Sequence, residues 1–308
     1  MSGSRKTERV DCLGLGIMPI DLLFSVDRYP AAGSKIDGLA LCIQGGGPVP
    51  NVMIGLRRLG HTTCLITAIG DDPTGQFGLE DLAHEGVDHR FVIQKSGTSD
   101  TASGFVEVGS GRRTLVLNRD IRITARDLKT SRYPIPRIVH LDGRDLSACL
   151  RLARWGKRVG AKITFDVGSI RNDVSPIFGL VDHLVVADSY ALGFTAARTA
   201  EHAIEKLSRL CPGTIVVTEG VKGSVGCENG IIVRRPAFKV KNVDATGAGD
   251  AFHTGYLYGL LHGFDLGDRL EFGAAVAALK CTRMGARAGI PTLAEVRRFM
   301  KGRPAVYA

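Results

Sequence analysis

The chain of 308 residues has no run of apolar residues long enough to cross a membrane, which would take about 18 in a row. Its N-terminal stretch, MSGSRKTERVD, also lacks the apolar segment of a secretory signal peptide. The sequence therefore predicts neither membrane insertion nor export, and we expect a cytoplasmic protein without a membrane partner.

Cysteines, histidines and aromatic residues are too scattered or too few for three further classes of function. The seven cysteines include no CxxC pair, and their odd number argues against a disulfide framework. The eight histidines show no HxxxH or HExxH spacing, so we expect no zinc site, and His253 is assigned only to a helix face. The net charge of +9 is dispersed and aromatics make up only 6%, which favours anionic small molecules over nucleic acid as partners.

What the sequence does contain is an alternation of apolar strands with amphipathic helices, which predicts a parallel sheet covered by helices in one domain over 1–308. Strand-like runs at 62–70, 137–143, 162–168, 183–188 and 213–220 alternate with helix-like runs at 50–60, 75–86, 146–160 and 200–210. Two stretches, 30–44 and 101–120, break this rhythm and predict antiparallel strands of a small accessory sheet.

The stretch DATGAGDAF, residues 244–252, combines two carboxylates with a glycine-rich turn before an apolar helix. Gly247 and Gly249 let the backbone approach an anion closely, and the helix N-terminus adds N–H donors and a positive dipole end. Asp250 would then lie beside a transferring phosphoryl group and could take a proton as a general base. A plain helix N-terminus capped by Asp250 explains the same residues, and this motif alone leaves the two interpretations even.

Other phosphate-binding motifs are missing from the sequence. The Gly156-Lys157 pair is followed by Arg158, so no P-loop is present, and the early GLG at 14–16 lacks the third glycine of a dinucleotide fingerprint. A second glycine-rich stretch, QGGGPVPNVMIGLRRLG at 44–60, places Asn51 at a helix start. Its amides could bind the hydroxyls of a sugar, although a simple strand-to-helix turn would look similar.

The pair GGPVPNVMIGLRRLG and DATGAGDAF, in this order, resembles the pfkB (ribokinase-like) family of carbohydrate kinases. TEGVKGS is similar to the family's nucleotide strand, and TRMGARAGIPT is similar to its C-terminal loop. The resemblance implies a three-layer α/β/α sandwich with a β-sheet lid formed by about 22–45 and 99–121. It also implies ATP, Mg²⁺ and a homodimer formed through the lid.

Carried over position by position, the resemblance assigns four groups of site residues. Asp250 matches the catalytic base, with Gly247, Ala248 and Gly249 as the anion hole. Sugar-binding positions fall on Asp21, Gly46, Gly47 and Asn51, and nucleotide-side positions fall on Thr218, Gly220, Gly223 and Gly285. Asp244 matches a residue that helps to hold a monovalent cation in several members, so the resemblance leaves activation by K⁺ open.

The sequence departs from the family pattern at three places, one of which is Ala245 where the family usually has Thr. Many members carry an NxxE motif linked to magnesium, where this chain has Ala187 and Tyr190. Pro19 stands where ribokinases place a sugar-binding Asn, which argues against a strict ribokinase. We therefore expect an ATP-dependent kinase acting on a primary hydroxyl of a small carbohydrate. A nucleoside kinase of the same family and a non-catalytic sugar-binding protein are the alternatives.

Overall fold

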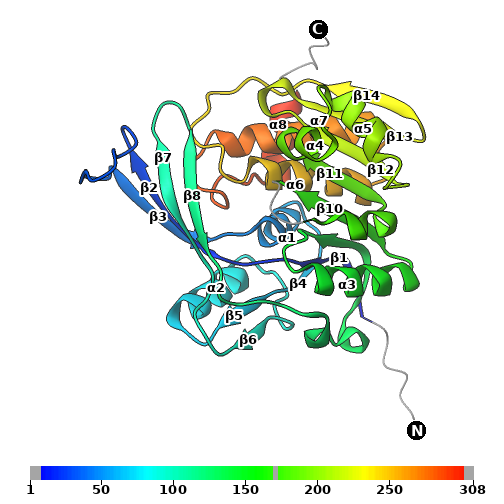
Figure 1. The fold of residues 1–308 in the computed structure, drawn as a ribbon, viewed down its shortest axis with the longest axis horizontal. Coiled ribbons are helices and arrows are strands. Elements are labelled where there is room, and N and C mark those ends of the chain that lie inside the picture. The colour runs from blue at the N-terminus through cyan, green and yellow to red at the C-terminus, as the bar shows by residue number, and fades with distance from the viewer. Residues whose placement is uncertain (1–7, 169–172, 302–308) are drawn as a thin grey trace.

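The computed structural model describes residues 8–168 and 173–301, so residues 1–7 of the N-terminal stretch used in the targeting prediction lie outside it. Its body is a three-layer α/β/α sandwich, with the smaller accessory sheet standing beside it at the left of Figure 1. Across the described part of the chain, every helix is too short or too polar to span a bilayer.

The central sheet follows the predicted alternation, and its strand order is β14-β13-β12-β11-β10-β9-β1-β4. From β4 to β12 all neighbours are parallel, while β12, β13 and β14 pair antiparallel. The hairpin between the last two strands turns at Asn229 and Gly230, which both have positive φ, as a tight turn requires. The strands are β1 (Arg9–Leu15), β4 (Thr63–Ile66), β9 (Ile135–Leu141), β10 (Lys162–Val167), β11 (His183–Ala187), β12 (Thr214–Thr218), β13 (Ser224–Glu228) and β14 (Ile231–Arg235).

Helices cover both faces of this sheet because its strand residues are apolar on both sides. Successive residues of β1 illustrate this, since Leu13 packs in the core under one helical layer and Cys12 in the core under the other. The first layer holds α3 (Leu146–Arg158), α4 (Asp188–Thr195) and α5 (Ala200–Leu207). The second holds α1 (Pro48–Arg58), α6 (Ala248–Leu261) and α7 (Leu266–Cys281), with α8 (Leu293–Lys301) against α7.

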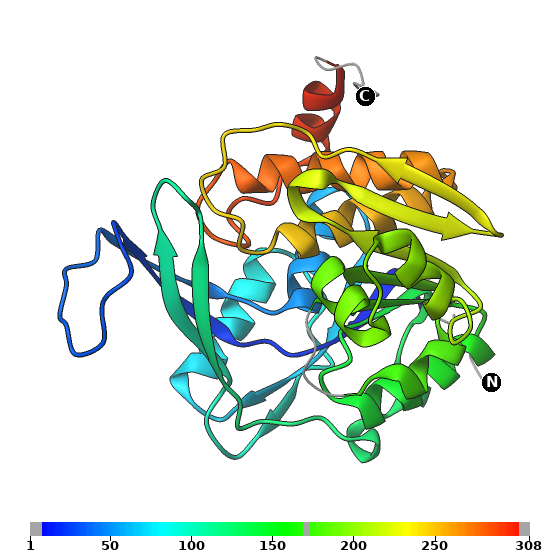
Figure 2. The ribbon, with the colours of Figure 1, turned by 45° about the horizontal axis from the view of Figure 1, so that its top comes forward.

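The accessory sheet has the strand order β3-β2-β7-β8 and projects from the body in Figure 2. Its strands are β2 (Ile20–Val26), β3 (Ala40–Gly45), β7 (Thr101–Glu107) and β8 (Arg113–Asn118). The expectation of antiparallel pairing is right for β2 with β3 and for β7 with β8. It misses the central junction, where β2 and β7 pair in parallel, because long-range pairing leaves no local signal.

Three further elements complete the fold. Helix α2 (Pro73–His84) packs near β3, and the short strands β5 (Ala68–Gly70) and β6 (Ile93–Lys95) pair in parallel. The sequence did not predict α4, whose residues DSYALGFT lack a clear amphipathic repeat. Its Tyr190 is almost fully buried and stacks on Phe194, so tertiary packing rather than local pattern accounts for this helix.

Candidate active site

A cavity of about 810 Å³ lies where the accessory sheet faces the carboxyl ends of the central strands. Parallel α/β sheets bind ligands at this edge, because loops from neighbouring strands meet there. Asp142 follows β9, Gly168 follows β10 and Asp188 follows β11, and all three line the cavity. The cavity is therefore placed where a parallel sheet offers a ligand the most polar backbone and side-chain groups.

Asp250 lies in the cavity wall in the first turn of α6 and is joined to Asn51 near the start of α1. Asn51 Nδ2 donates to Asp250 Oδ2 at 2.6 Å, and Arg287 Nε donates to Asn51 Oδ1 at 3.0 Å. Arg287 also donates to Gly46 O and pairs with Asp81. Because the arginine occupies the amide oxygen, the amide nitrogen must face the carboxylate, so the Asn51 orientation is fixed.

The environment of Asp250 suits a group that exchanges a proton near neutral pH. Loss of water around the carboxyl raises its pKa to about 6, and the negative charge of Asp166 adds to the rise, while the hydrogen bond from Asn51 opposes it. A carboxyl with this pKa is ionised at neutral pH and is a stronger base than an exposed aspartate.

The glycine turn before α6 is shaped by close backbone packing. Gly247 has φ of 75°, and a Cβ at this position would lie 2.9 Å from the Cβ of Ala286. Gly247 and Gly249 line the cavity. Ala248, which the sequence grouped with them, instead donates its N–H to Ala245 O at 3.1 Å. Ala251 N likewise donates to Gly247 O at 2.9 Å, so the backbone N–H groups left for an anion at this turn of the described chain are those of Gly247, Gly249 and Asp250.

The other residues expected to bind sugar, Asp21, Gly46 and Gly47, lie close to Asn51, whose N–H donates to Gly47 O. Asp21 on β2 is buried and lines the cavity, and burial raises its pKa to about 6 although Arg287 opposes the rise. Gly47 also lines the cavity and has φ of 93°, with no room for a side chain beside Ile17 O. A Cβ on Gly46 would lie 2.2 Å from Asp21 Oδ1, so this position has no room for a side chain beside the Asp21 carboxyl.

Of the four residues expected on the nucleotide side, two reach the cavity. Thr218 at the end of β12 and Gly220 beyond it line its wall. Gly223 instead packs against Arg235 O at the start of β13. Gly285 approaches Gln44 and donates its N–H to Asp244, away from the cavity wall.

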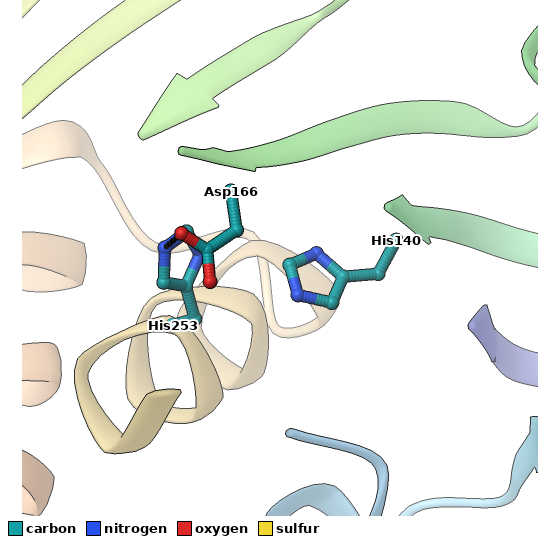
Figure 3. A group of neighbouring side chains, drawn as sticks. All are labelled: His140, Asp166 and His253. Atoms are coloured by element: carbon teal, nitrogen blue, oxygen red, sulfur yellow. Dashed lines mark ion pairs between the residues drawn. The ribbon is translucent and has the colours of Figure 1, made fainter. Parts of the chain in front are cut away.

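Figure 3 shows His140 from β9, Asp166 from β10 and His253 from α6 gathered together, and Asp166 also lines the cavity. His253 Nε2 lies 3.2 Å from Asp166 Oδ1, and this histidine holds the pKa of Asp166 below its usual value even though burial alone would raise it. The sequence assigned His253 only to a helix face, because this contact joins residues far apart in the chain.

A single metal ion would require ligand atoms of all three side chains at bonding distance. The three potential ligand atoms lie within 4.8 Å of one another. Ligands of one Zn²⁺ at about 2.1 Å would lie only about 3.4 Å apart. The Asp166–His253 pair, at 3.2 Å, meets that spacing, whereas the three atoms together are bounded only by 4.8 Å. The group is better described as a buried ion pair that fixes the Asp166 charge beside Asp250.

Two arginines in or next to the cavity wall, Arg287 and Arg113, had no sequence signal, whereas Asp244 had been assigned from the resemblance. Arg287 lies in the C-terminal loop and is known as a site residue only through its contacts with Asn51 and Gly46. Arg113 on β8 donates to Ala245 O at 3.1 Å, so the accessory sheet touches the 244–250 turn directly. Asp244 is fully buried behind the same turn and contacts Lys280 of α7.

A family model for the pfkB family carbohydrate kinases matches residues 8–293. The chain belongs to this family. Among its curated relatives, a 5-dehydro-2-deoxygluconokinase of Clostridium perfringens is 25% identical over 83% of this chain and 83% of its own. A nucleoside kinase of Methanothermobacter thermautotrophicus is 27% identical over 95% of this chain and 96% of its own.

A solved structure shows the same pfkB architecture. It is a ribokinase-like protein of E. coli in complex with ATP and Mg²⁺, and it covers 96% of this chain and 100% of its own at 22% identity, with a TM-score of 0.83. The family membership and the named relatives make the protein an ATP-dependent carbohydrate kinase.

Proposed function

We propose that this pfkB kinase transfers the γ-phosphoryl group of ATP to a primary hydroxyl of a small sugar acid bound under the accessory sheet. Asp250 takes the proton of that hydroxyl as its oxygen attacks the γ-phosphorus. The bond from this phosphorus to the β–γ bridging oxygen breaks, and ADP leaves with the electron pair. N–H groups of the first turn of α6, after Gly247, stabilise the charge that spreads over the phosphoryl oxygens.

The observation that carries this proposal is the 2.6 Å contact between Asn51 and Asp250. It joins the glycine turn expected to hold phosphate with the helix start expected to hold sugar, inside one cavity that Thr218 also lines. A helix-capping aspartate would accept hydrogen bonds from the backbone of its own helix. Asp250 instead accepts from the side chain of Asn51 on α1.

The cavity wall favours a small anionic carbohydrate over a nucleoside. Alternate residues of β8, namely Arg113, Leu115 and Leu117, face the cavity, and Arg119 follows just beyond the strand. Arg119 is engaged by Asp100 and Asp145, so the guanidinium available to a ligand is that of Arg113. This wall thus places an arginine beside apolar residues, an arrangement that can hold a carboxylate and a sugar carbon chain. The gluconate-type substrate in the name of the C. perfringens relative has this chemistry.

A nucleoside is the second candidate, because the M. thermautotrophicus relative is a nucleoside kinase. A nucleoside site normally stacks the base on an aromatic ring. Among the described residues that line the cavity there is no Phe, Tyr or Trp. Two aromatic residues of the accessory region are engaged elsewhere, since Phe105 packs with Phe24 and Tyr29 lies beneath Arg112. The cavity therefore supports the sugar acid better.

Magnesium fits this cavity even though the NxxE motif is missing. Mg²⁺ prefers carboxylate oxygens and water, and Asp188, directly after Ala187, places a carboxylate in the cavity wall. Asp188 would hold the ion directly or through water, and bound Mg²⁺ would neutralise phosphate charge. Tyr190, at the Glu position of the motif, is buried in the core instead.

The accessory sheet also supports the proposed homodimer. The face turned away from the cavity exposes Phe24 (41%), Leu41 (51%), Ile43 (51%) and Val116 (70%). The pairing registers of β2 with β3 and of β7 with β8 place these side chains on one face. An apolar face of this kind on a thin sheet is stabilised by covering it, and a second copy of the sheet would do so.

The test of the proposed function is ADP release with ATP and a panel of sugar acids, ketoses, aldoses and nucleosides. We expect the highest kcat/KM with a sugar acid. A preference for a nucleoside would replace the substrate class but leave the chemistry. Absence of turnover with every compound, together with sugar binding measured by calorimetry, would favour the non-catalytic sugar-binding alternative.

A further inference from the structure

Asp244 lies directly before the phosphate-binding turn, and the resemblance to the pfkB family left open whether it helps to hold K⁺. Its surroundings allow that possibility to be tested. Asp244 is fully buried, and each of its three oxygens accepts from a nitrogen. Oδ1 accepts from Thr246 N at 2.7 Å, Oδ2 from Gly285 N at 2.8 Å, and the backbone oxygen from Lys280 Nζ at 2.6 Å.

The positive charge that balances Asp244 is therefore the side-chain ammonium of Lys280. Lys280 Nζ lies 3.8 Å from Asp244 Oδ2, and both side chains have no exposed surface. A buried charge is tolerated when it is paired, and here one carboxylate balances one ammonium. A potassium ion added beside Asp244 would leave an uncompensated positive charge next to the ammonium in a fully buried region.

Lys280 also connects the segments that a cation bound at Asp244 would connect. Lys280 lies near the end of α7, where Val243 N donates to Cys281 O at 2.8 Å. The loop after α7 folds back over its side chain, since a Cβ on Gly289 would lie 3.1 Å from Lys280 Cε. The same loop carries Ala286, which packs against Gly247. The ammonium thus joins α7, the following loop and the phosphate-binding turn at one point.

We propose that the Lys280 ammonium takes the place of a monovalent cation at Asp244, so that this kinase does not depend on K⁺. Lys280 is then a positioning residue, because it acts on the phosphoryl group only through the 244–250 turn. The effect on turnover rests on the proposed kinase function, whereas the effect of K⁺ on thermal stability does not.

The experiment compares wild type, Lys280→Met and a matched control, Lys206→Met. Lys206 also donates to a backbone oxygen, Thr195 O at 2.9 Å, but it lies on α5 and outside the cavity wall. Melting temperatures are measured in KCl and in choline chloride at equal concentration. ADP release is then read by chromatography, because a coupling enzyme that itself requires K⁺ would obscure the result.

For wild type and for Lys206→Met, we expect the melting temperatures in KCl and in choline chloride to differ by no more than about 1 °C. Turnover of each protein should be the same in both salts. Lys280→Met should melt lower in choline chloride and gain about 2 °C or more in KCl, since K⁺ can then fill the site. A wild-type protein that melts higher or turns over several-fold faster in KCl would overturn the proposal, as would a folded Lys280→Met protein that ignores K⁺.

Two outcomes would remove part of the experiment, and each still allows a conclusion. If Lys280→Met does not fold, the wild-type comparison alone decides the question. If no substrate supports ADP release, the proposed function has failed, and the melting temperatures still decide whether Lys280 occupies the cation position.

Discussion

Replacing Asn51 by Ala should move the pH dependence of turnover to higher pH. The substitution removes the donor to Asp250 and leaves Arg287 Nε without its acceptor. The base must be ionised to accept a proton, so turnover falls as the pH drops through the pKa of Asp250, which is about 6. Loss of a hydrogen bond to the ionised form raises that pKa further.

The size of the change follows from the strength of a hydrogen bond to a charged group, about 1.5–3 kcal/mol. Since about 1.4 kcal/mol corresponds to one pH unit, the acidic limb should move up by about 1–2 pH units. Turnover of Asn51→Ala at neutral pH should therefore fall by roughly 2- to 10-fold and recover largely near pH 9. Binding of the sugar should also weaken by about 1–3 kcal/mol, because a substrate hydroxyl loses its partner.

The assay is kcat and kcat/KM for ADP release across the pH range with the best sugar acid. Gln76→Ala is the control, because Gln76 makes an exposed hydrogen bond to Glu80 on α2, outside the cavity wall. It should leave the profile unchanged. A profile of Asn51→Ala that keeps the wild-type acidic limb would refute the assignment of Asp250 as the titrating base. Wild-type affinity for the sugar would move the substrate site elsewhere.

Two further substitutions test the turn and the accessory sheet. Gly247→Ala places a Cβ 2.9 Å from that of Ala286 at a residue with φ of 75°, so we expect a melting temperature lower by several degrees and turnover reduced at least about tenfold. Unchanged turnover would show that the turn geometry is not needed. Val116→Glu puts a charge on the exposed apolar face and should raise the dimer dissociation constant by about tenfold or more, measured by light scattering. A strictly monomeric wild-type protein would remove the basis for this prediction.

The sequence predicted best what rests on local pattern. The alternation of strands and helices and the two glycine-rich helix starts each have a signal within a short window. The family resemblance added the three-layer fold, which the solved relatives confirm. Helix α4 was missed because its residues show no amphipathic repeat, and its stability comes from burial of Tyr190.

The sequence could not predict which side chains contact one another in the site, because these contacts join positions that only folding brings together. Asn51 and Asp250 are separated by 199 residues, and Arg287 enters the site only by contacting Asn51. The Asp244–Lys280 pair was hidden in the same way, since nothing near Lys280 in the sequence distinguishes it from a surface lysine. The contact with Asn51 opposes the rise that burial causes in the pKa of Asp250, and the Asp244–Lys280 contact underlies the proposed replacement of a cation.

The most direct test of the account is turnover of Asp250→Asn, measured beside its melting temperature. Asparagine keeps the shape and the contact with Asn51 but cannot accept a proton, so kcat should fall by about 10²- to 10⁴-fold. The carboxyl, with a pKa of about 6 instead of 3.8, is costly to ionise in the fold at neutral pH, by at most roughly 3 kcal/mol. The variant should therefore melt no lower than wild type at neutral pH. Near wild-type turnover in a folded Asp250→Asn protein would contradict the mechanism and leave Asp250 as a helix cap.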